Sequence, residues 1–258
     1  MVLDDEELVS WTEKSCGSIV AAASAVPPET PVPTAGDWTM TDLVAHVSSA
    51  LAGWFPFNMA KPPGQGDLAA AMGSAQGIPE AFEDRIDFLR EAVAEYVALV
   101  RGMDLATPAE GFFTAATARY WALRAATEFS VHAWDAQRAI GNQFVIPAAA
   151  AATCVDETIR GFWPAVVAMG ENGFSAAVEP PATPIGVVAS DAEHSWRVEY
   201  RDGNIEVDAA ADLPATTVSG SGHDLLLYQW GRIGLADLLT TGDAAAIADW
   251  NMVTAAGI

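Results

Sequence analysis

The spacing of apolar residues changes near Gly170, and this change limits what the chain can fold into. Before Gly170, apolar residues recur at three- and four-residue intervals, the period of amphipathic helices. After it, short segments alternate apolar and polar residues, the period of strands with one face buried. With 258 residues, 51% of them hydrophobic, the chain is long enough for two cores. We therefore predict a helical domain over residues 1–170 and a small α+β domain over residues 171–258.

Helical periodicity predicts four long helices in the first domain, over residues 4–25, 39–54, 79–103 and 114–140, and a further helical stretch over 148–169. Thr39 and Asp42 have the spacing of a capping box, and Gly141 stands where a helix-ending glycine is expected. Four long helices with short and long connections are typical of a four-helix bundle. No strands are expected to pair within residues 80–140. The stretch 56–77 is rich in Pro and Gly and is predicted to be a functional or mobile loop.

Strand patterns in the second domain occupy residues 183–190, 195–201, 204–208 and 215–220. Turns are expected between the first three strands, at residues 191–194 and 202–203. Ser221 then begins one helix, and Asp243 begins the last one. Together these elements predict a small α+β module.

The charge of the chain excludes some classes of partner. Lys and Arg number 12 against 34 Asp and Glu, which gives a net charge of −22. Such a chain repels polyanions, so we expect it to bind neither nucleic acid nor membranes. The start of the sequence lacks the basic and apolar regions of a secretion signal, and Cys16 and Cys154 stand alone without a metal-binding spacing. These features predict a cytoplasmic protein with reduced thiols. A monomer and a homodimer are both compatible with the sequence.

Three polar residues follow one stripe of the helix predicted over residues 114–140. Glu128 and His132 are four residues apart and therefore point the same way, and Asp135 lies on the same stripe. This spacing lets one helix offer two ligands to one metal ion, and helical bundles commonly build metal sites from inward-facing side chains. An alternative is a solvated face on which Arg124, Glu128, Asp135 and Arg138 form ion pairs. Bulky apolar residues point in several directions around this helix, which indicates burial and weakens that alternative.

His46 is the candidate third ligand. It borders the apolar stripe of the second predicted helix, and the small residues Ala50 and Gly53 on the same side leave room beside its imidazole. With Glu128 and His132 it completes a His₂Glu set, the ligand type of catalytic zinc sites with an open coordination position. Taken alone, a histidine beside an apolar stripe is more often an ordinary core residue than a ligand. His194, in a predicted turn, and His223, at the start of a helix, are expected to have surface roles.

Two stretches of the sequence, DWTMTDLVAHVSSALAGW (37–54) and EFSVHAWDAQRAIG (128–141), resemble the signature segments of the mycothiol-dependent maleylpyruvate isomerase family. The C-terminal stretch TVSGSGHDLLLYQWGRI is similar to the small C-terminal domain of that family. The resemblance implies a DinB-like metal-binding four-helix bundle followed by a sterol-carrier-like α+β domain. A chain in which only Lys14 and Lys61 are lysines also fits the Arg-rich proteins of the actinobacteria, which make mycothiol.

The resemblance also implies roles for individual residues. His46, Glu128 and His132 would hold a divalent metal, with Zn²⁺ the expected ion, and mycothiol would be the thiol cosubstrate. Asp135 would orient or balance a ligand from outside the metal's own shell, and Arg232 would clamp a carboxylate of the substrate.

These implications lead to a working hypothesis of an isomerase or S-transferase in which a metal-bound thiolate attacks a small electrophile, either maleylpyruvate-like or xenobiotic. Two alternatives stay open. One is a metal-dependent hydrolase that uses metal-bound hydroxide. The other is a non-enzymatic protein that binds a metal or a lipid-like ligand.

Overall fold

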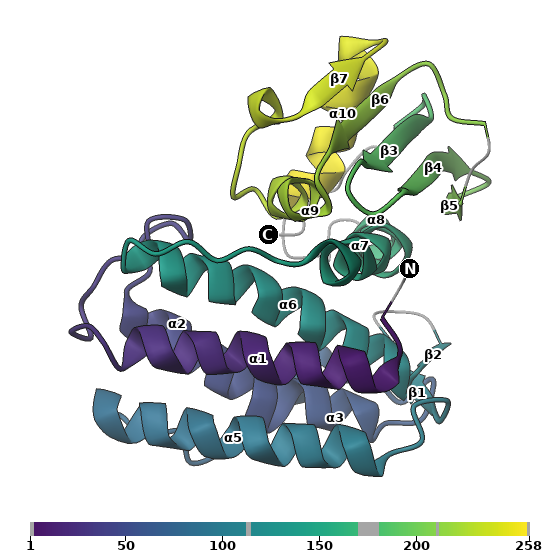
Figure 1. Cartoon of the computed structure of the whole chain (residues 1–258). Coiled ribbons are helices and arrows are strands. Elements are labelled where there is room, and N and C mark those ends of the chain that lie inside the picture. The colour runs from purple at the N-terminus through teal and green to yellow at the C-terminus, as the bar shows by residue number, and fades with distance from the viewer. Residues whose placement is uncertain (1–2, 112–114, 170–180, 210–211, 257–258) are drawn as a thin grey trace. The chain divides into compact units, whose positions relative to one another are not determined.

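The structure, a computed structural model, describes residues 3–111, 115–169, 181–209 and 212–256. Contacts between Cα atoms divide the chain into a helical unit, Leu3–Val145, and an α+β unit, Ile146–Ile258 (Figure 1). A helical N-terminal region followed by a sheet-containing C-terminal region is the fold class predicted from the sequence, which is confirmed.

The helical unit contains α1 (Asp5–Ala23), α2 (Met40–Ser49), the π-helical turn η1 (Ala50–Trp54), α3 (Phe55–Met59), α4 (Leu68–Met72), α5 (Phe82–Gly102) and α6 (Ala118–Ala139). The long helices α1, α5 and α6 and the shorter α2 pack together as the bundle (Figure 1). Large apolar side chains such as Leu8, Leu43 and Phe129 are fully buried between them. Burial of this kind, worth about 1.5–3 kcal/mol for each large side chain, is the main force that holds the bundle together.

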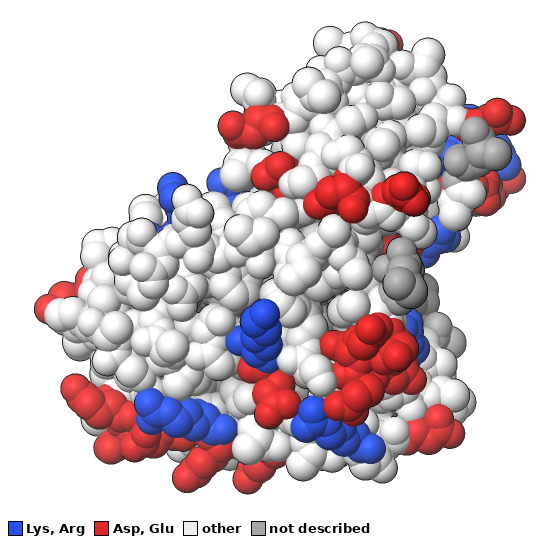
Figure 2. All heavy atoms as spheres, viewed as in Figure 1, with Lys and Arg blue, Asp and Glu red and all other residues white. Residues whose placement is uncertain are grey.

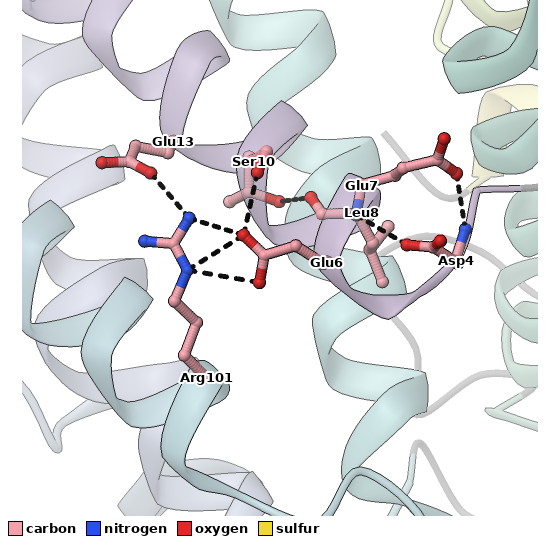
Figure 3. A network of polar contacts seen from close by, with 8 residues as sticks. Asp4, Glu6, Glu7, Leu8, Ser10, Glu13 and Arg101 are labelled. Atoms are coloured by element: carbon pink, nitrogen blue, oxygen red, sulfur yellow. Dashed lines mark hydrogen bonds and ion pairs between the residues drawn. The ribbon is translucent and has the colours of Figure 1, made fainter.

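Capping boxes begin two of these helices. Thr39 and Asp42 cap α2 as predicted, since each residue binds the backbone N–H of the other. Asp4 and Glu7 do the same at the start of α1, each over 2.9 Å (Figure 3). These caps fix where α1 and α2 begin, and α2 carries His46.

Polar contacts also join α1 to its neighbours. On the surface, the Arg101 guanidinium from α5 donates to the Glu6 and Glu13 carboxylates of α1 (Figure 3). In the core, Trp11 Nε1 of α1 donates to Ser130 Oγ of α6 over 2.7 Å. The exposed ion pairs contribute little stability, whereas a buried hydrogen bond between two helices also fixes their register.

Two expectations for the helical unit need correction. Strands do pair within residues 80–140: β1 (Pro108–Glu110) and β2 (Ala115–Thr117) form a short antiparallel hairpin between α5 and α6. The stretch 56–77 holds α3 and α4, and the Glu110 carboxylate accepts the N–H of Gly64. This segment is therefore held to the hairpin by hydrogen bonds, which the Pro- and Gly-rich composition did not indicate.

Gly53 has a packing role that its position in the sequence did not show. A Cβ added there would overlap the backbone of Ala75, so the segment after α4 packs directly on this glycine. The room expected beside His46 at this position is therefore taken up by residue 75. Gly53 lies in η1, a turn with π-type hydrogen bonds that follows α2 and shifts the later residues around the helix axis.

The α+β unit contains α7 (Ala148–Glu157), the π-helical turn η2 (Thr158–Phe162), α8 (Trp163–Met169), β3 (Ile185–Ala189), β4 (His194–Arg201), β5 (Asn204–Asp208), β6 (Thr217–Gly220), α9 (Gly222–Gln229), η4 (Leu235–Asp237), β7 (Leu239–Thr241) and α10 (Ala244–Ala256). Its sheet has the strand order β5-β4-β3-β6-β7, with β3 and β6 parallel and the other pairs antiparallel. The four strands predicted from alternation are present. The additional edge strand β7 has three exposed residues and so lacks the alternation that would have revealed it.

The helices over residues 148–169 belong to this second unit by their contacts. α7 packs mainly on α9, and α8 contacts α10 and β5. The compact units therefore divide between Val145 and Ile146, earlier in the chain than the change of periodicity near Gly170. Periodicity marks where helices give way to strands, and these helices cover the sheet that follows them.

Surface charge and hydropathy complete the picture of the fold. On the face shown in Figure 2, acidic side chains gather in patches and basic ones lie singly among them. None of the helices in the described residues is long and apolar enough to cross a membrane. Cys16 and Cys154 are both buried and form no disulfide, and burial raises the pKa of the Cys16 thiol.

Candidate metal centre

α2 and α6 bring the three candidate ligands together. His46 Nε2 lies 3.0 Å from Glu128 Oε1, and His132 Nε2 lies 3.3 Å from the same oxygen. One ligand atom from each residue lies within 4.8 Å of the other two. Tetrahedral zinc ligands at about 2.1 Å from the ion stand about 3.4 Å apart, so two of these separations already match a metal site.

The burial of these residues separates the two interpretations of the α6 stripe. Glu128, Asp135 and Arg124 are buried, and of the four residues in the proposed solvated face Arg138 alone is exposed. The interpretation as a solvated face is therefore wrong for Arg124, Glu128 and Asp135. A carboxylate taken out of water needs charged or hydrogen-bonding partners, and Glu128 has them.

Asp135 orients His132. Its Oδ2 lies 3.0 Å from His132 Nδ1, and its Oδ1 accepts a hydrogen bond from Thr34 Oγ1 at 2.6 Å. Because an ionised carboxylate only accepts, the Nδ1 proton of His132 points to Asp135 and Nε2 faces Glu128 and His46. A carboxylate behind a histidine ligand fixes the ring and raises its basicity. Sequence reasoning missed Thr34, because a threonine in a proline-rich connector carries no pattern that points to a site.

Trp38 covers the two histidine rings. Its ring centroid lies 5.0 Å from that of His46 and 5.8 Å from that of His132, nearly parallel to the latter. The residue directly precedes the Thr39 cap, so the start of α2 also determines where the indole lies. This tryptophan lies in the motif of residues 37–54, which by itself assigns it no role. An aromatic residue next to the cap of a ligand-bearing helix is the signal that could have revealed it.

The charges at the centre shift the titration of two ligands. Burial raises the pKa of Glu128, but hydrogen bonds to His132 and His46 and the charge of Arg124 outweigh it, so this pKa lies well below its ordinary value. Burial lowers the pKa of His132, but hydrogen bonds to Asp135 and Glu128 outweigh it and raise this pKa. Metal binding here would therefore displace a proton from His132 and weaken as the pH falls.

The donor set also agrees with a particular group of metals. Two imidazole nitrogens and one carboxylate oxygen are the ligands of catalytic zinc sites, which keep one position for water or substrate. Imidazole nitrogen also suits other transition metals, whereas Mg²⁺ and Ca²⁺ prefer oxygen. His46 is half-buried and the other two ligands are buried, so solvent reaches the cluster beside His46.

Residues 13–137 match the model described as the mycothiol maleylpyruvate isomerase N-terminal domain. The chain carries this domain. This match supports the family suggested by the two sequence motifs, and the matched residues include His46, Glu128, His132 and Asp135.

Two solved structures resemble the chain in their fold. The crystal structure of the mycothiol-dependent maleylpyruvate isomerase matches with a TM-score of 0.57 and 15% identity over 92% of this chain and 93% of that one. A histidine-to-alanine mutant of it matches with a TM-score of 0.58 and 16% identity over the same shares. A comparison with curated proteins found no match to the sequence.

Other residues named in the sequence analysis lie outside the mycothiol maleylpyruvate isomerase domain. Arg232 follows α9 in the α+β unit, where its Nη1 donates to the carbonyl oxygen of Trp230 over 2.8 Å. Its role toward a substrate stays a prediction. His194 begins β4 and packs on Trp196, with ring centroids 4.7 Å apart. The Nδ1 of His223 accepts the N–H of Ile146 over 3.3 Å, a structural contact that its place in a first helical turn did not suggest.

Proposed function

We propose that the protein is a zinc-dependent enzyme that uses mycothiol to isomerise, or to transfer the thiol to, a small electrophile. The observation that carries the proposal is the cluster of His46 Nε2, Glu128 Oε1 and His132 Nε2 within 4.8 Å, inside a domain of the mycothiol maleylpyruvate isomerase family. The fold over 92% of the chain also resembles that of the mycothiol-dependent maleylpyruvate isomerase. At 15–16% identity this likeness concerns the fold alone.

The three residues would hold the metal through two nitrogens and one oxygen. A divalent metal held in this way supplies Lewis acidity, which lowers the pKa of a bound thiol so that the thiolate is available near neutral pH.

The other residues of the centre prepare the ligands. Asp135 retains the Nδ1 proton of His132 and so leaves Nε2 free for coordination, while Thr34 fixes the carboxylate that does this. Trp38 shields both rings on one side and so directs access to the more open side beside His46. We also propose that Arg232 binds a carboxylate of the substrate, for which a guanidinium is well suited.

Metal analysis followed by a thiol-consumption assay tests the proposal. The purified protein should contain about one zinc per chain, and His132→Ala should lose it. With mycothiol present, a panel of cis-unsaturated acids and alkylating electrophiles should then reveal isomerisation or loss of free thiol. Full metal content in His132→Ala would overturn the ligand assignment.

Two other outcomes would identify a different function. Turnover of esters or amides that needs the metal but no thiol would indicate a hydrolase. A bound metal with no turnover, together with a ligand that co-purifies, would indicate a binding protein. Arg232→Ala tests the substrate contact separately, because it should reduce turnover while the metal content stays unchanged.

A further inference from the structure

The two carboxylate oxygens of Glu128 have different partners. Oε1 lies 3.0 Å from His46 Nε2 and 3.3 Å from His132 Nε2, so it is the oxygen that belongs to the ligand cluster. Oε2 accepts a hydrogen bond from Arg124 Nη2 over 2.9 Å. Both residues come from α6, where a separation of four places brings them to the same face. The Glu128 carboxylate therefore faces the ligand cluster with Oε1 and the Arg124 cation with Oε2.

Arg124 is unusual for its depth. Its side chain is 5% exposed, and that of Glu128 is 9% exposed. Taking both charges out of water is costly unless they are paired, and an exposed arginine that happened to lie nearby would carry no such cost. Arg138, in the last turn of the same helix, is exposed and packs over the Trp134 ring. α6 therefore places one arginine at the surface and the other beside a candidate ligand.

The consequence concerns how Glu128 can bind a metal. A carboxylate can coordinate through one oxygen or through both, and coordination through both requires that neither oxygen is held by another partner. A guanidinium on Oε2 competes for that oxygen and withdraws negative charge from the ligand. Both effects preserve an open coordination position and a stronger Lewis acid.

We propose that Arg124 is a positioning residue that restricts Glu128 to coordination through Oε1 alone. The inference rests on the metal site of the proposed function, but it adds a residue to which neither the sequence motif nor the ligand geometry assigns a role. It requires no titration of Arg124 and no contact between Arg124 and the metal.

Cobalt substitution provides the test, because the visible absorption of Co²⁺ reports its coordination number. The wild-type protein, Arg124→Met, Arg124→Lys and the matched control Arg138→Met are loaded with one equivalent of Co²⁺. In Arg124→Met the second oxygen is released, and the molar absorption should fall by about half or more as the coordination number rises. Arg124→Lys, which keeps a cation and an N–H donor for Oε2, should restore the wild-type band. Arg138→Met should not change it.

The outcomes are separable. If wild-type protein binds no Co²⁺, the proposed metal site is wrong. If it binds Co²⁺ and Arg124→Met gives the same spectrum at full cobalt content, the metal site stands and the role of Arg124 is overturned. Loss of the band in Arg124→Lys as well as in Arg124→Met would also count against it. Should Arg124→Met fail to fold, Arg124→Ala takes its place, because the smaller side chain leaves room for water to solvate the carboxylate, and the same fall is expected.

Discussion

Two places with buried polar side chains, one in each unit of the molecule, differ in whether those polar groups have hydrogen-bond partners. In the helical unit, Glu128 and Asp135 are buried and every contact described for them is with another polar or charged group of the cluster. In the α+β unit, Gln229 is 3% exposed at the end of α9, and neither atom of its amide has a hydrogen-bond partner among the described residues. It lines an apolar cavity with Trp163, Val187 and Trp250.

The comparison shows how a cluster of buried polar residues that serves a function differs from a buried polar residue that only lowers stability. Mutually satisfied charges specify a geometry, because moving one leaves another unpaired. An amide without a partner specifies nothing and lowers stability. Removing Glu128 should therefore destabilise the helical unit, whereas removing the Gln229 amide should stabilise the α+β unit.

The largest effect is expected for Glu128→Ala. It removes a ligand and leaves Arg124 as a buried charge that has lost its Glu128 partner, so the helical unit should lose about 3–5 kcal/mol of unfolding free energy. Metal binding should be lost as well. Chemical denaturation and metal analysis measure the two effects, and Glu95→Ala, an exposed position on α5, is the control. A stability loss no larger than that of the control would contradict the buried pair.

Asp135→Asn is expected to weaken metal binding about 10–100-fold while the fold is retained. The amide keeps a group of the same shape beside Thr34 and His132 but removes the charge that orients the ring. Competition with a chromogenic chelator measures the affinity. Asp37→Asn, exposed in the same connector as Thr34, should leave the affinity unchanged. Equal affinities in the two variants would show that Asp135 does not act on the ligand.

The opposite sign is expected for Gln229→Met. Methionine has a similar length and no strong polar atom, so the α+β unit should gain about 1–3 kcal/mol of unfolding free energy. Thermal and urea denaturation, with tryptophan fluorescence as the probe, should detect the gain. The matched control is Gln137→Met, because Gln137 Nε2 donates to the carbonyl oxygen of Ser18 over 2.8 Å and its removal should destabilise. Destabilisation by both substitutions would contradict the contrast between the Glu128 cluster and Gln229.

The smallest effect is a pH dependence of the α+β unit through His223. Burial lowers the pKa of His223 below its ordinary 6.5, against the opposing charges of Asp224 and Asp191. The unfolded chain therefore takes up this proton more readily than the folded one. The stabilising contribution is present above pH 6.5 and is lost as the pH falls through the lowered pKa. The bond from the Ile146 N–H is then lost too, because a protonated Nδ1 cannot accept it.

Urea denaturation at a series of pH values between 7.5 and 5 checks this prediction. His223→Asn should flatten the loss of stability on the acidic side, and His194→Asn should leave it in place. The loss of stability in the wild type is expected to be modest, since His223 is only half-buried. A profile that is the same in both variants would assign the pH dependence to other groups.

The sequence predicted those parts of the molecule that depend on neighbours along the chain. The Thr39–Asp42 box, the pair Glu128 and His132, and the alternation of β4 are all local, and each was found where predicted. Family resemblance brought His46 to the same cluster, which spacing alone could not do because α2 and α6 are separate helices.

What the sequence could not predict depends on contacts between distant segments. Thr34 meets Asp135 only because the connector before α2 crosses α6, and Arg124 looks like any helical arginine until its burial is known. The helices over 148–169 have ordinary helical periodicity, which does not say which core they cover. The hairpin of β1 and β2 is too short for an alternating pattern to be recognised.

Trp38 gives the ligand cluster an optical label. With ring centroids only 5.0 and 5.8 Å from those of His46 and His132, the indole is near enough for its fluorescence to be quenched by a protonated imidazole or by a paramagnetic ion beside the rings. The chain has nine tryptophans, so the signal of this one is the difference between the wild-type protein and Trp38→Phe. The aromatic residue that encloses the centre thus also makes ligand exchange at the centre visible in real time, without any added dye.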